Sequence, residues 1–166
     1  MNFGLYNPVF RFLSPSGENA KLLVFIFHRV LAKADPLLAA EPDKDQFDWM
    51  MQFVSKNFNV LPFGQAVSLM YSGNLPAASA CITFDDGYQD NYSVAVPILQ
   101  RYGIVGTFFI ATAFLNGGRM WNDDIIETIR ASPSSIVNWS DFGLGEHNLS
   151  SHQEKLTAID SVLKTL

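Results

Sequence analysis

The sequence is poor in cysteine and in histidine, and it has no long apolar segment. The single cysteine, Cys81, cannot form an internal disulfide, so the sequence does not imply an oxidising compartment. Because Cys81 lies in an apolar run, we expect a buried and unreactive thiol. The longest continuous apolar run, Leu22–Phe27, is far too short to cross a bilayer, so no transmembrane segment is predicted.

Basic residues are also scarce. The chain has 11 lysines and arginines against 16 acidic residues, a formal net charge of −5. This balance argues against a nucleic-acid partner, which would require clustered basic side chains. Residues 1–20, which we interpret as an N-terminal extension, do not combine a basic start with a continuous apolar stretch. Without an export signal, we expect a cytoplasmic or membrane-peripheral protein.

Short apolar runs alternate with segments that repeat apolar residues at helical spacing. Such alternation predicts an α/β fold in which the strands are parallel. The segment 43–58 is typical, because an aspartate that can cap a helix precedes a regular apolar stripe. The expected strands are residues 22–27, 80–84 and 105–112, and the expected helices are 47–58, 63–71, 95–102, 121–130 and 151–166.

Two adjacent carboxylates, Asp85 and Asp86, follow the apolar strand that ends at Phe84, and Gly87 then predicts a turn. Ligands of α/β proteins bind at the carboxyl ends of strands. One carboxylate of such a pair can hold a divalent metal while the other accepts a proton from water. A solvated turn is the alternative reading of so short a motif.

The segment Thr83–Gly87 resembles the first motif of the polysaccharide deacetylase family. The resemblance extends from about Leu22 to Leu115 and includes the segments Phe27–Val30, Tyr88–Tyr92, Pro97–Leu99, Tyr102–Ile104 and Gly106–Phe109. Residues 120–123 are similar to an insertion in a bacterial branch of the family, and residues 131–166 are interpreted as inserted too. On this reading, residues 21–166 are the N-terminal portion of a deacetylase-like domain.

The resemblance implies a partial, distorted (β/α) barrel, truncated after its first strands, and an enzyme that hydrolyses N-acetyl groups of amino sugars in a polysaccharide. By the same resemblance, Asp85 is the catalytic base and Asp86 a ligand of a divalent metal, expected to be zinc. His28, at the end of the first strand, could contact the substrate, or it could be a structural histidine. For Trp121 we expect core packing in preference to contact with a sugar.

The family's second motif, two histidines four residues apart, has no good match. His147 and His152 are five residues apart, and we interpret them as a surface loop and a helix start. Two alternatives stay open: these histidines join Asp86 in a compact metal site, or the chain is a non-catalytic glycan-binding module on a degenerate scaffold. We expect residues 1–166 alone to be inactive as a deacetylase. We also expect them to self-associate through exposed strand edges and apolar surface.

Overall fold

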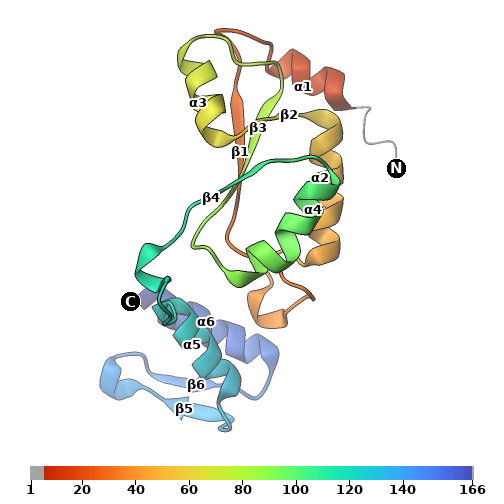
Figure 1. Ribbon diagram of the computed structural model, residues 1–166. Coiled ribbons are helices and arrows are strands. Elements are labelled where there is room, and N and C mark those ends of the chain that lie inside the picture. Colours follow the sequence, from red (N-terminus) through yellow and green to blue (C-terminus); the bar gives the residue numbers. More distant parts are fainter. Residues whose placement is uncertain (1–5, 166) are drawn as a thin grey trace. The chain divides into compact units, whose positions relative to one another are not determined.

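The computed structural model describes residues 6–165, which fall into two compact units (Figure 1). Among the described residues, unit 1 is formed by 6–34 and 40–111, and unit 2 by 35–39 and 112–165. The first five residues of the predicted N-terminal extension, and Leu166 at the end of the last predicted helix, lie outside the described part.

Unit 1 is built on a parallel sheet, as the sequence predicted. Its central strand, β3 (Ser79–Phe84), pairs along its whole length with β1 (Leu22–Phe27). The other edge of β3 pairs with β2 (Asn59–Val60) and then with β4 (Gly106–Phe108). β1 and β3 lie at the positions expected, because an apolar run of five or six residues suits a strand whose faces are covered by helices.

The strand predicted over residues 105–112 is much shorter, because β4 ends at Phe108. Its partner β3 ends at Phe84, so the chain beyond β4 runs beside a turn instead of a strand. The Phe109 N–H still donates to the Phe84 carbonyl at 2.8 Å, while residues Phe109 and Ile110 are each 47% exposed. The apolar sequence continues beyond Phe108, but β3 has already ended at Phe84 and offers no further strand partner. The apolar run therefore predicted too long a strand.

The side chains of β3 alternate between two cores. Ile82 and Phe84 pack in the cluster formed with α2 (Lys44–Asn57) and α4 (Val96–Arg101), whereas Cys81 packs in the cluster formed with α3 (Phe63–Tyr71). Figure 1 shows α2 and α4 together on one side of the sheet and α3 on the other. All six residues of β3 are buried, so this strand holds the start of the acidic turn at Asp85 in a fixed position.

Local signals in the sequence set the helix boundaries. The Asp43 side chain accepts hydrogen bonds from the N–H groups of Asp45 and Gln46, and the Gln46 side chain returns a bond to the Asp43 N–H. This reciprocal capping box fixes the start of α2. The N-terminal helix α1 (Asn7–Leu13) packs on unit 1 through Phe10, whose ring centroid lies 4.6 Å from that of Phe58.

Unit 2 contains α5 (Trp121–Ala131), α6 (His152–Thr165) and a hairpin of β5 (Ile136–Asn138) and β6 (Glu146–Asn148). A capping box precedes α6: the Ser151 hydroxyl donates to the Glu154 carboxylate and accepts a hydrogen bond from the Glu154 N–H. The hairpin was not predicted, because its strands are three residues long and show no apolar alternation. The expectation of core packing for Trp121 was wrong, because 58% of that residue is exposed at the first turn of α5.

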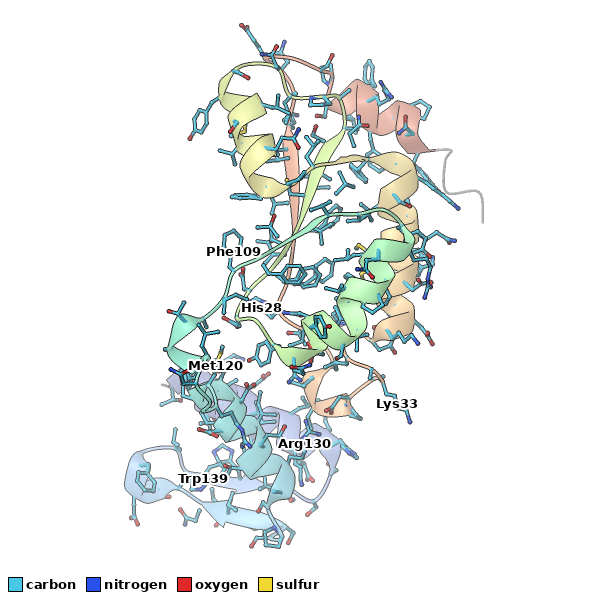
Figure 2. The ribbon with its side chains drawn as sticks, viewed as in Figure 1. His28, Lys33, Phe109, Met120, Arg130 and Trp139 are labelled. Atoms are coloured by element: carbon cyan, nitrogen blue, oxygen red, sulfur yellow. The ribbon has the colours of Figure 1, made fainter. Side chains whose placement is uncertain are left out.

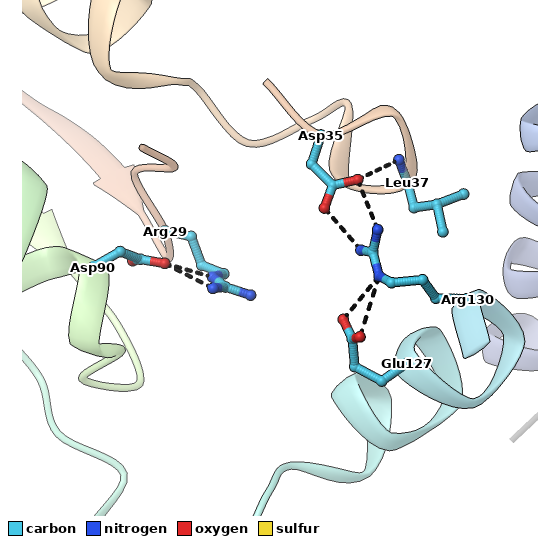
Figure 3. Close-up of polar contacts among 6 residues, drawn as sticks. All are labelled: Arg29, Asp35, Leu37, Asp90, Glu127 and Arg130. Carbon is cyan, nitrogen blue, oxygen red and sulfur yellow. Dashed lines mark hydrogen bonds and ion pairs between the residues drawn. The ribbon is translucent and has the colours of Figure 1, made fainter. Parts of the chain in front are cut away.

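A bidentate ion pair joins residues 35–39 to the rest of unit 2 (Figure 3). The Arg130 guanidinium donates to both carboxylate oxygens of Asp35, at 3.1 and 2.8 Å, and its Nε bonds Glu127 at 3.2 Å. The bonds from Asp35 raise the pKa of Arg130. Asp35 also accepts the Leu37 N–H, so a single carboxylate caps the short helix Pro36–Leu38 and anchors it to α5.

None of the helices within residues 6–165 combines the length and the apolar character needed to span a bilayer.

Candidate active site

The candidate site lies at the carboxyl edge of the parallel sheet in unit 1. His28 follows β1, Asp85 follows β3 and Phe109 follows β4, so all three leave the same edge of the sheet. Figure 2 labels His28 and Phe109 at this edge. The His28 Nε2 lies 4.0 Å from Asp85 Oδ2, and the two side chains are 52% and 39% exposed. The structure thus brings together two of the three predicted site residues where water and a ligand can reach them.

The turn after β3 has an unusual backbone. Asp86 has a φ of +71° and Gly87 a φ of +77°, so two successive residues are left-handed. The predicted turn at Gly87 is confirmed, but it begins one residue earlier, at an aspartate, one of the few non-glycine residues that tolerate this conformation. Strained backbone of this kind concentrates at functional sites.

Three backbone hydrogen bonds hold the turn in place. The Asp85 N–H donates to the Phe27 carbonyl and the Gly87 N–H to the Asp85 carbonyl, both at 2.9 Å. The Ala111 N–H donates to the Asp86 carbonyl at 3.3 Å. The two carboxylates are therefore carried on a backbone that is fixed from both β1 and the segment after β4.

An ion pair missed in the sequence lies beside the turn (Figure 3). The Arg29 Nε and Nη2 donate to Asp90 Oδ2 at 2.9 and 2.8 Å, and the Val30 N–H reaches Asp90 Oδ1 at 3.3 Å. The same guanidinium lies 4.7 Å from the centre of the Tyr88 ring, at cation–π distance. A signal for this contact was present in the sequence: Arg29 follows β1 and Asp90 follows β3, and the ends of these parallel strands are neighbours.

The described residues do not by themselves form a metal site. Within residues 6–165, no group of three His, Cys, Asp or Glu side chains is placed to hold a metal ion. The His147 Nε2 lies 2.7 Å from the Leu144 carbonyl, its ring centroid is 5.3 Å from that of Trp139, and His152 is exposed at the start of α6. The roles predicted for Asp85 as base and Asp86 as metal ligand, and for His28 at the substrate, stay predictions.

Comparison with known proteins identifies the family. The family profile described as polysaccharide deacetylase matches residues 72–158, just over half of the chain, including β3 and the acidic turn. The chain belongs to the polysaccharide deacetylase family. One curated relative is the protein YxkH of Bacillus subtilis (strain 168), which is named for the same family. It is 31% identical to this chain over 93 residues. That match covers 55% of this chain and 32% of YxkH.

Solved deacetylase structures share the fold. The Streptococcus pyogenes deacetylase PplD, solved in complex with acetate, is similar with a TM-score of 0.51 and 22% identity over 68% of this chain. IcaB from Ammonifex degensii gives a TM-score of 0.50 and 21% identity over 70% of this chain. The chain spans 54% and 50% of those two proteins, and about a third of YxkH. The partial coverage and the parallel α/β sheet agree with the predicted fold, part of a deacetylase-type barrel.

Proposed function

We propose that the protein containing this chain is a carbohydrate deacetylase that hydrolyses N-acetyl groups of amino sugars in a polysaccharide. One observation carries the proposal: in a member of this family, Asp85 stands on a strained turn at the carboxyl edge of the sheet, 4.0 Å from His28. The negative net charge and the few basic residues suit a neutral glycan better than a nucleic acid.

The proposed reaction assigns a proton-transfer role to Asp85. Its carboxylate accepts a proton from a water molecule as the water oxygen attacks the acetyl carbonyl carbon. The sugar nitrogen then takes the proton that Asp85 accepted, the C–N bond breaks, and the amine and acetic acid leave, the acid losing its proton to solvent as acetate. With 39% of its side chain exposed, Asp85 is accessible to both water and a polymer, and His28 is close enough to orient the acetamide beside it.

Metal dependence is part of this proposal, with Asp86 as one ligand of a divalent ion, expected to be zinc. Two adjacent carboxylates are too few for a zinc site, because zinc usually takes four ligands, and at least three of them come from the protein. Since the described residues do not supply a third ligand near the turn, we derive no chemical step through the metal.

Acetate release tests the proposal. The product of the complete gene is incubated with chitin oligosaccharides and a panel of other N-acetylated glycans, with the same glycans chemically deacetylated as controls. We expect acetate from one class of N-acetylated glycan, lost on chelation and restored by zinc. Release that survives complete chelation would contradict the metal dependence, and no release from any glycan would contradict the function.

A second candidate is a glycan-binding module without chemistry, favoured by the missing three-ligand group in residues 6–165. It predicts binding on a glycan array by the complete gene product with no release of acetate. Acetate release that is lost in Asp85→Asn would exclude this alternative.

We also propose a cytoplasmic or membrane-peripheral location. Recovery of the protein outside the cell in a fractionation would contradict it.

A further inference from the structure

We propose that Arg29 and Asp90 are positioning residues, which hold His28 against Asp85 by tying together the two segments that leave β1 and β3. The inference rests on the proposed function, because it assigns these residues to the same site. Neither residue was assigned a role from the sequence.

The sheet ladder fixes only one side of the His28–Asp85 pair. Phe27 lies opposite Phe84 in the β1–β3 register, and the Asp85 N–H donates to the Phe27 carbonyl at 2.9 Å. Beyond that bond the two chains diverge, because Asp86 turns left-handed. The backbone bonds that fix the turn do not hold the His28 and Asp85 side chains to each other, and these side chains are 52% and 39% exposed.

The Arg29–Asp90 ion pair closes the other side. Arg29 follows His28 directly, and Asp90 lies beyond the left-handed turn, so the pair joins the two segments again after they diverge. Both carboxylate oxygens of Asp90 are used, one by the guanidinium and the other by the Val30 N–H. His28 and Asp85 therefore lie between two contacts that join the segments: the Asp85–Phe27 backbone hydrogen bond and the Arg29–Asp90 ion pair.

Further contacts fix the arginine itself. Its N–H donates to Glu41 Oε2 at 3.2 Å, and its guanidinium covers the Tyr88 ring. The Arg29 and Asp90 side chains are only 28% and 13% exposed, so solvent and salt screen the pair weakly. Lysine at position 29 would keep the positive charge. It would lose the planar guanidinium, which donates two hydrogen bonds to Asp90 Oδ2 and covers the Tyr88 ring.

The same unit offers a matched control. Arg101 and Asp48 form another arginine–aspartate pair, with Nη1 2.6 Å from Oδ1, between α4 and α2. Its side chains are 56% and 33% exposed, and Asp48 also accepts a hydrogen bond from the Tyr102 hydroxyl at 3.2 Å. Asp48→Asn therefore removes a similar interaction from unit 1 without removing a tie at the carboxyl edge of the sheet.

The experiment compares Asp90→Asn, Arg29→Lys and Asp48→Asn with the wild-type product of the complete gene. Two readouts are taken: the kcat and KM of acetate release, and the NMR cross-peak between the His28 ring protons and the β protons of Asp85. The cross-peak is measured with selective labels, and His28 is assigned by its loss in His28→Gln. Asp90→Glu, which keeps the carboxylate, serves as the conservative rescue.

We expect Asp90→Asn and Arg29→Lys to lose the His28–Asp85 cross-peak and to lower kcat about 100-fold, the scale of effect of a small misplacement. Their KM should change less than kcat, Asp48→Asn should keep both readouts, and Asp90→Glu should recover part of each. Folded variants that keep the cross-peak, or an equal loss in Asp48→Asn, would overturn the proposal. If the wild type releases no acetate, the proposed function fails, while the cross-peaks still decide whether the pair positions His28.

Discussion

Replacement of Gly87 by alanine tests whether the acidic turn needs its left-handed backbone. Gly87 has a φ of +77°, and a side chain in that conformation costs about 1–2 kcal/mol. An added Cβ would also lie 2.8 Å from the Ile110 Cδ1. Because that atom ends a flexible side chain that is 47% exposed, it can rotate away, and the backbone strain is the larger cost.

Cys81 provides the assay. It is the only cysteine, it is fully buried on β3, and burial raises the pKa of its thiol, so a thiol reagent reacts with it only after unit 1 opens. A loss of 1–2 kcal/mol raises the open population, and therefore the labelling rate, by roughly 5- to 30-fold. Parallel urea titrations should show the same loss in the free energy of unfolding.

Gly64→Ala is the matched control. Gly64 lies in α3 with an ordinary φ, and an added Cβ meets nothing within 4 Å. Alanine there should not speed labelling, because Gly64 lies in the first turn of α3 and alanine is a better helix former than glycine. In an Ile110→Val background, which removes Cδ1, Gly87→Ala should keep most of its cost. Labelling of Gly87→Ala no faster than wild type would refute the argument that this turn needs a left-handed backbone at residue 87.

Three further predictions concern other parts of the chain. Arg130→Ala should destabilise unit 2 by about 1.5–3 kcal/mol, measured by unfolding followed through Trp139 fluorescence, because it strips hydrogen bonds from Asp35 and Glu127; the exposed pair Lys164–Asp160 is the control, and Lys164→Ala should cost at most about 1 kcal/mol. The outer edge of β1 lacks a strand partner within the described residues and carries Ile26 at 61% exposure, so Ile26→Lys should reduce the self-association of residues 1–166 in size exclusion with light scattering, whereas Tyr71→Lys, at an exposed position of α3, should not. Calorimetry should give the same zinc affinity for this chain with and without His152→Ala, and a clear loss in the variant would restore the histidines as ligands.

Much of the sheet could be predicted because its signals are local. The run Leu22–Phe27 and the run ending at Phe84 are continuous apolar segments, and a parallel sheet covered by helices is the structure that buries them. Asp43 and Asp45 were both candidate caps for α2; Asp43 is the cap, and the helix begins at Lys44, three residues before the expected start. The acidic turn was found for the same reason: its residues are neighbours in sequence.

Long-range and weakly patterned features could not be predicted. Arg29 and Asp90 are 61 residues apart, and only the parallel register of β1 and β3 brings them together. The hairpin of unit 2 could not be predicted, because its three-residue strands show no period of two and pack on the helices through Val137 and the neighbouring Trp139. The irregular turn Asn91–Ala95, a π-helical segment before α4, left no apolar pattern either.

The most direct test of the account is the rate of acetate release by the complete gene product in which Asp85 is replaced by asparagine. Asparagine keeps the size of the side chain and its place on the turn but cannot accept the proton. We predict a fall in kcat of about 10²- to 10⁴-fold with a folded protein, while Asp48→Asn stays close to wild type. An Asp85→Asn enzyme that releases acetate at the wild-type rate would contradict the account.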